Sequence, residues 1–360
     1  MTARQDAIYM ARAIQLAKKG LYTTDPNPRV GCVLVRDGQI IGEGWHVQSG
    51  QGHAEIEALQ NTEHAKGATA YVTLEPCSHQ GKTPPCCDAL INAGVSRVVV
   101  AMQDPNPLVS GRGLERLKAS GCEVSCGLLM EEAQTLNRGF IKRMTLNRPF
   151  VRSKLAMSLD GRTALASGES KWITSTEARA DVHQLRAQSS AILTGINTVL
   201  ADDPALTARV ASDVTQPIRV VLDSTLKMPV TAQISKLEGR SLILTCSDDK
   251  EKYVELQSAG FEVYKLPSKN TRLELSAVMD FLAQQQINEV LVEAGSVLNG
   301  ALLVENLVDE WIVYMAPCVL GDQGRGLFSV PGLDKMSDKK DLILRDVRQV
   351  GSDLKLTLTQ

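Results

Sequence analysis

The sequence predicts an α/β protein of two domains, and three observations support this prediction. The chain has 360 residues, a length typical of two domains. Helical and strand-like hydrophobic patterns alternate in both halves. Between the halves, the segment Thr145-Leu-Asn-Arg-Pro149 ends in a proline, which disfavours a helical conformation at the preceding residue. We therefore expect one domain over residues 1–146 and a second over residues 147–360, each with its own core.

The first half begins with apolar residues at helical spacing, which predict a helix over residues 4–19. Asp37-Gly38 separates two apolar runs and indicates a β-hairpin. The glycine-rich segment 49–52 precedes a helix that starts near His53. The remaining elements expected in this half, in chain order, are strands 30–35 and 40–45, helix 53–59, strand 70–74, helix 83–93, strand 97–101, helix 111–120, strand 123–126 and helix 131–144.

The second half starts with an apolar strand over residues 150–156 and alternates again. Strands that alternate with helices predict a mainly parallel sheet. Residues 225–285 and 325–360 carry no recognisable motif. The further elements expected here are helix 176–188, strands 190–195, 218–222 and 241–245, helix 273–285, strand 289–293, helix 296–304 and strand 310–316.

The strongest functional signal is His53-Ala54-Glu55, followed by Pro76-Cys77 and then Cys86. Zinc binds nitrogen and sulfur ligands in a tetrahedron, and a catalytic site leaves the fourth position to water, whose pKa falls to about 7. The pattern H-x-E with a later P-C-x-x-C is typical of zinc-dependent nucleobase deaminases. Here eight residues separate the two cysteines instead of two. Cys87 therefore competes with Cys86 as a ligand, and spacing alone does not choose between them.

A single cysteine or histidine is more often a packing residue than a ligand. The cysteines in or beside apolar runs are therefore interpreted as core residues: Cys32, Cys122, Cys126, Cys246 and Cys318. Three histidines have no other candidate ligands beside them and are interpreted as surface or packing residues: His46, His64 and His183.

Several motifs in the expected order resemble the bifunctional deaminase/reductase family of riboflavin biosynthesis. The zinc segment, Thr73-Leu-Glu-Pro-Cys-Ser-His-Gln-Gly-Lys-Thr-Pro-Pro-Cys86, is similar to that of the family. The other matching motifs are Asn27-Pro-Arg-Val-Gly31, His53-Ala-Glu55, Lys154-Leu-Ala-Met-Ser-Leu-Asp-Gly-Arg162, Gly168-Glu-Ser-Lys-Trp-Ile-Thr174, Thr198-Val-Leu-Ala-Asp-Asp-Pro204 and Val292-Glu-Ala-Gly-Ser296. The resemblance implies an N-terminal cytidine-deaminase-like domain and a C-terminal dihydrofolate-reductase-like domain that uses NADPH.

For the first domain, the resemblance implies one zinc ion per chain, held by His53, Cys77 and Cys86. Glu55 would carry protons in the hydrolytic removal of the 2-amino group from a diaminopyrimidinone ribosylamine phosphate. The side chains that would position this phosphorylated pyrimidine are Asn27, His79 and Lys82.

For the second domain, the resemblance implies reduction of the ribosyl group to ribityl by NADPH, with Lys154 and Asp202 as catalytic residues. Lys154 lies inside an apolar strand, where an unpaired cation is costly. The residues implied at the substrate are Ser170, Arg186, Leu206, Arg209 and Glu293, and arginine suits a sugar phosphate because guanidinium binds phosphate oxygens bidentately. The residues implied at NADPH are Ala156, Trp172, Thr198, Asp202, Ser224, Gly295, Ser296, Val297, Leu298, Asn299, Gly300 and Ala301. Gly295 also precedes a predicted helix, whose first N–H groups can bind a phosphate.

Composition argues against other classes of protein. The formal net charge is −2 and aromatic residues make up 4% of the chain, which disfavours a nucleic-acid partner. The alternative of an RNA-base deaminase with a C-terminal RNA-binding module is disfavoured for this reason. A third alternative, a zinc-stabilised module without catalysis, needs a fourth protein ligand, for which His79 is the nearest candidate.

The sequence also gives expectations about the protein's environment. No run of eighteen apolar residues is present, so we expect no membrane span. The first residues lack an apolar signal-peptide core, and free cysteines suit a reducing compartment, so we expect a cytoplasmic protein. We further expect a homo-oligomer, either a dimer or a tetramer.

Overall fold

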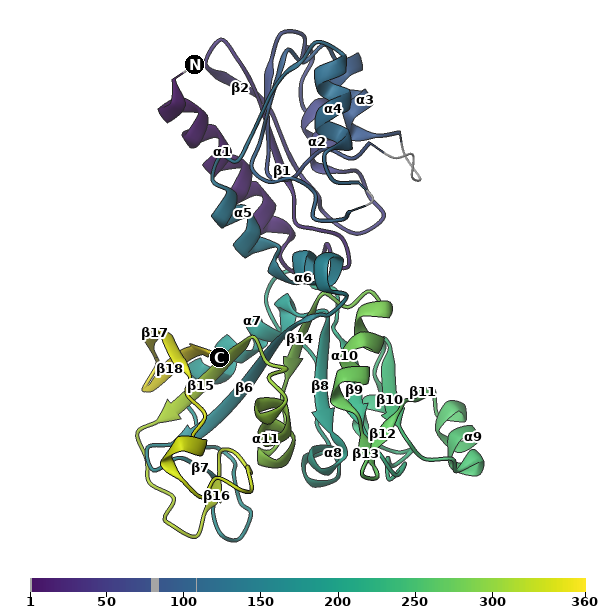
Figure 1. Ribbon diagram of the computed structural model, residues 1–360, viewed down its shortest axis with the longest axis vertical. Coiled ribbons are helices and arrows are strands. Elements are labelled where there is room, and N and C mark those ends of the chain that lie inside the picture. Colours follow the sequence, from purple (N-terminus) through teal and green to yellow (C-terminus); the bar gives the residue numbers. More distant parts are fainter. Residues whose placement is uncertain (1, 79–83, 108) are drawn as a thin grey trace. The chain divides into compact units, whose positions relative to one another are not determined.

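The computed structural model describes residues 2–78, 84–107 and 109–360 (Figure 1). This part of the chain forms two compact units, Met1–Asn147 and Arg148–Gln360. The division lies one residue beyond the boundary expected from the sequence. Each unit has its own hydrophobic clusters, and each is therefore described by itself.

In the described part of the first unit, five strands form one sheet in the order β2-β1-β3-β4-β5. β1 is antiparallel to both β2 and β3, whereas β3, β4 and β5 are parallel to one another. The strands are β1 Gly31–Arg36, β2 Gln39–Trp45, β3 Thr69–Val72, β4 Arg97–Val100 and β5 Glu123–Cys126. The helices are α1 Ala3–Ala17, α2 Ala54–Gln60, α3 Cys86–Asn92, α4 Arg112–Ala119, α5 Met130–Leu136 and α6 Arg138–Leu146.

Helices cover both faces of this sheet (Figure 1). Successive residues of a strand point to opposite faces, and β1 shows this directly. Leu34 packs in a cluster with α2, α3 and α4, whereas Val33 packs in another with α1 and α5. Both faces of β1 are fully buried, which explains its continuous apolar run.

The helix expected over residues 131–144 is interrupted at Asn137, so this prediction was wrong in one respect. Asn137 has φ −117° and separates α5 from α6. Its buried side chain accepts a hydrogen bond from the Arg29 N–H at 2.8 Å and donates one to the Arg29 carbonyl at 2.9 Å. The side chain thereby satisfies both backbone groups of a residue outside the sheet, which local hydrophobic periodicity does not reveal.

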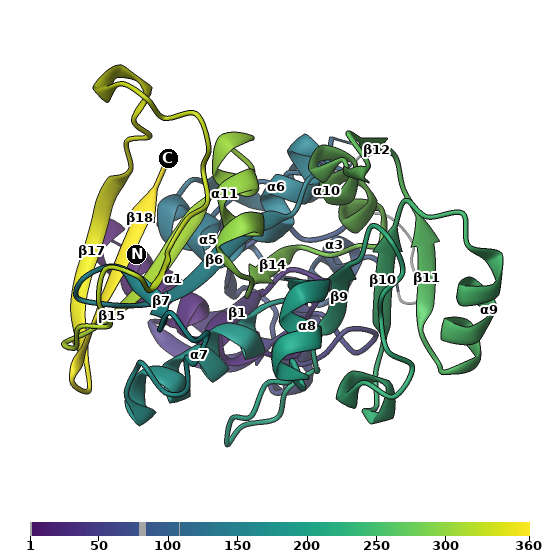
Figure 2. The same ribbon diagram turned by 90° about the horizontal axis from the view of Figure 1, so that it is seen from below.

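The second unit, all of whose residues are described, contains a nine-stranded sheet in the order β11-β10-β9-β8-β14-β6-β15-β18-β17 (Figure 2). The strands from β11 to β15 are parallel, and only the terminal hairpin β17–β18 runs antiparallel to its neighbours. The strands of this sheet are β6 Phe150–Ser158, β8 Ala191–Gly195, β9 Ile218–Leu222, β10 Ser241–Thr245, β11 Glu262–Lys265, β14 Glu289–Val292, β15 Glu310–Ala316, β17 Ile343–Val350 and β18 Asp353–Thr359. The predicted mainly parallel α/β sheet is confirmed.

Helices again cover the two faces of the sheet. Apolar side chains of α10 and α11 pack on one face, and those of α7, α8 and α9 pack on the other. These helices are α7 Thr176–Gln188, α8 Ile196–Asp202, α9 Lys250–Ser258, α10 Leu275–Gln284 and α11 Ser296–Val304. Two small ladders complete the unit: β7 Arg162–Ala164 pairs with β16 Arg325–Gly326, and β12 Ser268–Lys269 pairs with β13 Arg272–Leu273.

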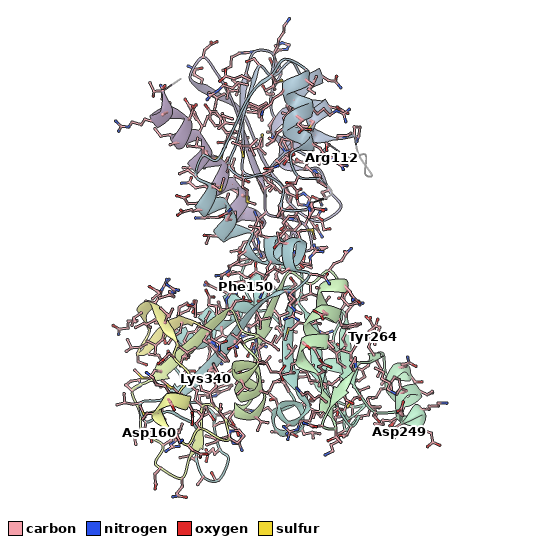
Figure 3. The ribbon with its side chains drawn as sticks, viewed as in Figure 1. Arg112, Phe150, Asp160, Asp249, Tyr264 and Lys340 are labelled. Atoms are coloured by element: carbon pink, nitrogen blue, oxygen red, sulfur yellow. The ribbon has the colours of Figure 1, made fainter. Side chains whose placement is uncertain are left out.

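Phe150 and Asp160, both labelled in Figure 3, lie near opposite ends of β6. Phe150 begins β6, and Asp160 follows its carboxyl end. Asp160 accepts hydrogen bonds from the backbone N–H groups of Leu320, at 3.1 Å, and Gly321, at 2.8 Å. This carboxylate links the turn after β6 to the segment after β15. The two connections at the carboxyl end of these strands are therefore held together.

Hydrophobic periodicity did not predict α9 or the C-terminal hairpin β17–β18. α9 has a recognisable start, since the Asp249 side chain caps it by accepting from the Lys252 N–H at 3.0 Å (Figure 3). β17 is an edge strand that leaves most of its side chains exposed, so it has no inward-facing apolar pattern.

No helix in the described part of the chain combines the length and the apolar character that a membrane crossing requires.

We expect fragments 1–147 and 148–360 to fold separately, because each unit encloses its own apolar clusters. Each purified fragment should show one cooperative thermal unfolding transition by circular dichroism. Aggregation of both fragments under all conditions tested would contradict this expectation.

Candidate metal centre and ligand cleft

His53, Cys77 and Cys86 come together from three segments of the first unit. His53 is the residue that precedes α2, Cys86 is the first residue of α3, and Cys77 lies in the loop after β3. One ligand atom from each residue lies within 4.8 Å of the other two. The His53 Nδ1 is 3.2 Å from the Cys86 Sγ and 3.6 Å from the Cys77 Sγ. Tetrahedral zinc keeps neighbouring nitrogen and sulfur ligands roughly 3.5–3.8 Å apart, so this donor set fits zinc.

The structure decides between the two candidate cysteines. Cys87 is buried, and its thiol donates hydrogen bonds to the carbonyls of Pro76, at 3.1 Å, and Gly113, at 3.5 Å. Consecutive residues on a helix point about 100° apart, so Cys86 and Cys87 cannot both face His53. Cys86 is the residue in the triad.

Glu55 lies in the first turn of α2, next to the triad, and is 3% exposed. Burial raises the pKa of Glu55 to about 7, and His53 opposes this shift. A carboxyl group with a pKa in this range holds and releases a proton easily near neutral pH. Its position and its burial therefore suit a proton carrier beside a metal-bound water.

Glu75 anchors the loop that carries Cys77, a role that the sequence analysis did not assign. Its buried carboxylate accepts hydrogen bonds from the backbone N–H groups of Gly113 at 2.8 Å, Gly111 at 3.0 Å and Asp104 at 3.1 Å. These bonds fix the loop before Pro76-Cys77 against the start of α4. A carboxylate two residues before a cysteine is the sequence signal for this anchor.

Asn27 is paired with His46, which the sequence analysis had assigned to the surface or to packing. His46 is 3% exposed, and its ring lies edge-on to the His53 ring with centroids 5.5 Å apart. The His46 Nδ1 donates to the Gly52 carbonyl at 2.9 Å, so its Nε2 accepts from the Asn27 amide at 3.1 Å. Burial lowers the pKa of His46, which favours this neutral form. The two other predicted substrate residues, His79 and Lys82, lie outside the described residues.

In the second unit, an open cleft of about 2210 Å³ lies at the carboxyl ends of the parallel strands. Its lining includes sixteen of the residues predicted there from the sequence: Lys154, Ala156, Ser170, Trp172, Arg186, Thr198, Asp202, Leu206, Arg209, Ser224, Glu293, Gly295, Ser296, Val297, Leu298 and Ala301. The cleft therefore gathers residues that are spread over nearly 150 positions of the chain.

Asn299 and Gly300 are buried and are not among the residues that line this cleft. The Asn299 side chain accepts from the Ser153 Oγ at 2.6 Å and donates to the Ala294 carbonyl at 2.8 Å. A Cβ atom at Gly300 would lie 2.0 Å from the Ser329 carbonyl oxygen. Both residues pack α11 against neighbouring segments and so support the cleft wall from within the protein.

Charged side chains of opposite sign meet at the base of the cleft. Arg186 forms a bidentate ion pair with Glu293, at 2.6 Å from Nε and 2.9 Å from Nη2, and its Nη1 donates to the Thr207 carbonyl at 3.1 Å. Burial would raise the pKa of Glu293, but Arg186 and Lys154 together hold it below its ordinary value. Burial lowers the pKa of Lys154, and Glu293 opposes this shift.

The start of α11 offers an open position for an anion. Gly295 precedes the helix, no side chain caps its first N–H groups, and a Cβ atom at Gly295 would meet nothing within 4 Å. Asp202 lies on another wall, where it forms a half-exposed ion pair with Lys171 at 3.2 Å.

His183 also lines the cleft, although its sequence context gave no sign of a ligand role. Its Nε2 is 2.9 Å from the Arg209 Nη2. The partner lies 26 positions along the chain, so local sequence could not reveal this contact.

Each of the two units contains a match to a known protein family. Residues 3–102 match the family model described as "Cytidine and deoxycytidylate deaminase zinc-binding region", and residues 149–356 match "RibD C-terminal domain". Among curated proteins, the chain is 52% identical to "Riboflavin biosynthesis protein RibD" of Escherichia coli, over 98% of this chain and 99% of that protein. It is 49% identical to the Haemophilus influenzae protein of the same name, over 99% and 97%.

Two solved structures are similar over 99% of both chains. One is Acinetobacter baumannii RibD, at 45% identity and a TM-score of 0.92. The other is a Thermotoga maritima diaminohydroxyphosphoribosylaminopyrimidine deaminase/5-amino-6-(5-phosphoribosylamino)uracil reductase, at 36% identity and a TM-score of 0.86. The similarity therefore extends over both units.

We expect Cys86→Ser to lose most of its zinc, because it removes one of three converging donors. Cys87→Ser is the matched control and should keep one zinc per chain, since its sulfur faces two carbonyls. Metal analysis of the purified proteins by inductively coupled plasma mass spectrometry measures both. The reverse result would contradict the ligand set.

Proposed function

Because the chain belongs to the RibD family of riboflavin-biosynthesis deaminase/reductase enzymes, we propose that residues 1–147 carry the deaminase and residues 148–360 an NADPH-dependent reductase. The enzyme is bifunctional, and its zinc-binding deaminase region holds the His53, Cys77 and Cys86 triad. The observation that carries the deaminase assignment is the buried Glu55 beside this triad. Family membership argues against the two alternatives, which were an RNA-base deaminase and a zinc module without catalysis.

The deaminase substrate that we propose is 2,5-diamino-6-(5-phosphoribosylamino)pyrimidin-4-one, which loses its 2-amino group to water. When bound, zinc makes water nucleophilic near neutral pH. Glu55 takes one proton from the attacking water and gives it to the ring nitrogen, and it then moves a second proton to the departing ammonia. The pKa of Glu55, raised by burial, supports both halves of this exchange.

The Asn27 carboxamide would orient the pyrimidine ring through its hydrogen-bonding edge. The neutral His46 holds this amide at 3.1 Å, which fixes its position before substrate enters. His79 and Lys82 remain substrate residues proposed from the sequence.

In the second unit, we place NADPH along the wall formed by the start of α11. The uncapped N–H groups and the open space at Gly295 support a cofactor phosphate there. Bound NADPH would supply a hydride to C1 of the ring-opened, imine-like sugar. Further residues proposed at the cofactor, all lining the same cleft, are Ala156, Trp172, Thr198, Asp202, Ser224, Ser296, Val297, Leu298 and Ala301.

The substrate would occupy the base of the cleft. Arg209 and Arg186 are proposed to bind its phosphate, with Ser170, Leu206 and Glu293 around the sugar. Addition of a hydride to the imine carbon requires a proton on nitrogen. Lys154, whose pKa is lowered by burial, releases a proton more easily than an ordinary lysine and is the proposed donor.

Two further expectations from the sequence are carried forward as proposals. A site with two cysteine ligands needs reduced thiols, which supports a cytoplasmic location. A homo-oligomer, dimer or tetramer, is proposed on the sequence resemblance alone.

We predict that Glu55→Gln keeps its zinc but loses at least about 10²-fold in deamination, because an amide cannot carry the proton. Glu57→Gln, on the same helix, is the matched control and should retain activity. Ammonia release measures deamination, and NADPH oxidation with pre-deaminated substrate should continue at the wild-type rate. Normal ammonia release from Glu55→Gln would remove this carboxylate from the mechanism.

We predict that NADPH raises the melting temperature of the full chain, since a ligand at 100 times its Kd stabilises the folded protein by about 2.7 kcal/mol. Asp202→Ala should slow NADPH oxidation while zinc content and deamination persist. Asp213→Ala, an exposed carboxylate outside the cleft lining, is the control. No melting shift with NADPH and no substrate-dependent oxidation would contradict the reductase assignment.

A further inference from the structure

His183 is placed to contact whatever occupies the cleft beside Arg209. It lies on α7, one helical turn before Arg186, and both residues line the cleft. The His183 Nε2 lies 2.9 Å from the Arg209 Nη2, and its Nδ1 lies 3.3 Å from the Arg209 backbone nitrogen. One imidazole therefore faces both the guanidinium and the backbone of Arg209.

A neutral imidazole has one N–H donor and one acceptor nitrogen. Burial lowers the pKa of His183, as do Arg186 and Arg209, while Glu293 and a hydrogen bond to the Thr207 carbonyl oppose the shift. The lowered pKa favours the neutral form of the ring. Its two nitrogens must then take different roles, and the surrounding groups determine which roles are open to each.

Both neutral forms of the ring have a backbone partner for Nδ1. With the proton on Nδ1, the ring donates to the Thr207 carbonyl, and Nε2 accepts from the Arg209 guanidinium. With the proton on Nε2, Nδ1 accepts from the Arg209 backbone N–H, and Nε2–H becomes a donor. In this second form the guanidinium is repelled, and an anion is the favoured neighbour of Nε2.

The segment that carries Arg209 is held in place by other contacts. The Gln216 side chain accepts from the Ala208 N–H at 3.0 Å and donates to the Ala208 carbonyl at 2.9 Å. Arg186 also binds the Thr207 carbonyl at 3.1 Å. Gln216 and Arg186 thus hold the backbone of this segment without help from His183. The His183 Nε2 is therefore not needed to fix the segment and can bind a ligand in the cleft.

Arg186 and Arg209 differ in how far protein groups already engage them. Arg186 directs its Nε and Nη2 to Glu293 and its Nη1 to Thr207. Arg209 is exposed, and its guanidinium Nη2 lies 2.9 Å from the His183 Nε2. Arg209 can therefore turn toward an incoming anion at the cost of one hydrogen bond to a neutral imidazole.

We propose that His183 Nε2 holds the Arg209 guanidinium while the cleft is empty and then donates a hydrogen bond to the substrate phosphate, which makes His183 a third phosphate ligand. This inference rests on the proposed function, in which the reductase cleft binds a sugar phosphate. His183 would then determine the preference for a phosphorylated substrate over its dephosphorylated form, without touching the atoms that react.

Two substitutions in the full-length enzyme distinguish the roles of the two ring nitrogens of His183. His183→Gln places an amide near the position of Nε2, where it can accept from Arg209 or donate to phosphate. His183→Asn reaches only the position of Nδ1 and keeps the backbone contact. The measurements are KM and kcat for reduction of the deaminated ribosylamino-uracil phosphate, the same values for its dephosphorylated form, and the inhibition constant of inorganic phosphate.

We expect His183→Asn to raise KM for the phosphorylated substrate about tenfold and to weaken inhibition by inorganic phosphate to a similar extent, because a hydrogen bond to a charged group is lost. KM for the dephosphorylated form, KM for NADPH and the deamination rate should stay unchanged. His183→Gln should remain within about threefold of the wild type.

The inference is overturned if His183→Asn binds the phosphorylated substrate as tightly as the wild type. It is also overturned if both variants raise KM equally for the phosphorylated and the dephosphorylated substrate, since this would mean that the ring only supports the fold. A wild-type enzyme that does not distinguish the two forms would overturn the proposed phosphate site together with the role of His183. If the wild type prefers the phosphorylated substrate and His183→Asn keeps this preference, the proposed function stands and only the role of His183 is rejected.

Discussion

Strands that run in one direction end at one edge of a sheet, and both candidate sites depend on this constraint. In the first unit, β2 and β3 run in the same direction because each is antiparallel to β1, so His53 and Cys77 follow strands that end at the same edge. In the second unit, Glu293 follows β14, and the cleft lies where the parallel strands end. Helices begin at these edges, so polar side chains converge on the same space as uncapped N–H groups.

The base of the cleft in the second unit holds an ion pair, and removal of either partner would be costly. Arg186 and Glu293 are 15% and 14% exposed at their side chains, and Lys154 lies beside them. Loss of one partner would leave an unpaired charge in a poorly hydrated site, at a cost of several kcal/mol. The ion pair also reaches the backbone of Thr207, so it fixes the relative positions of α7, the end of β14 and the segment that carries Arg209.

The sequence predicted those features that depend on local pattern and motif spacing. The alternation of elements, the mainly parallel second sheet and the grouping of His53 with two cysteines follow from such signals. Spacing did not distinguish Cys86 from Cys87, because neighbouring residues have the same chemistry; the resemblance implied Cys86, and the structure confirms it. His46 and His183 were assigned to the surface or to packing, since their partners, Asn27 and Arg209, are distant in sequence. The break at Asn137 was missed for the same reason, since the group that it satisfies belongs to Arg29.

The contact between Asn137 and Arg29 indicates that the metal triad and the segment around Asn27 depend on different lengths of chain. All three zinc ligands lie within residues 3–102, the region shared with other zinc deaminases. The backbone groups of Arg29, two residues from Asn27, are instead satisfied by a side chain 108 positions later. Shortening the chain to its metal-binding region would therefore release the segment that carries Asn27, the residue proposed to orient the pyrimidine. The helices α5 and α6 flank the residue that holds this segment, although neither contributes a metal ligand.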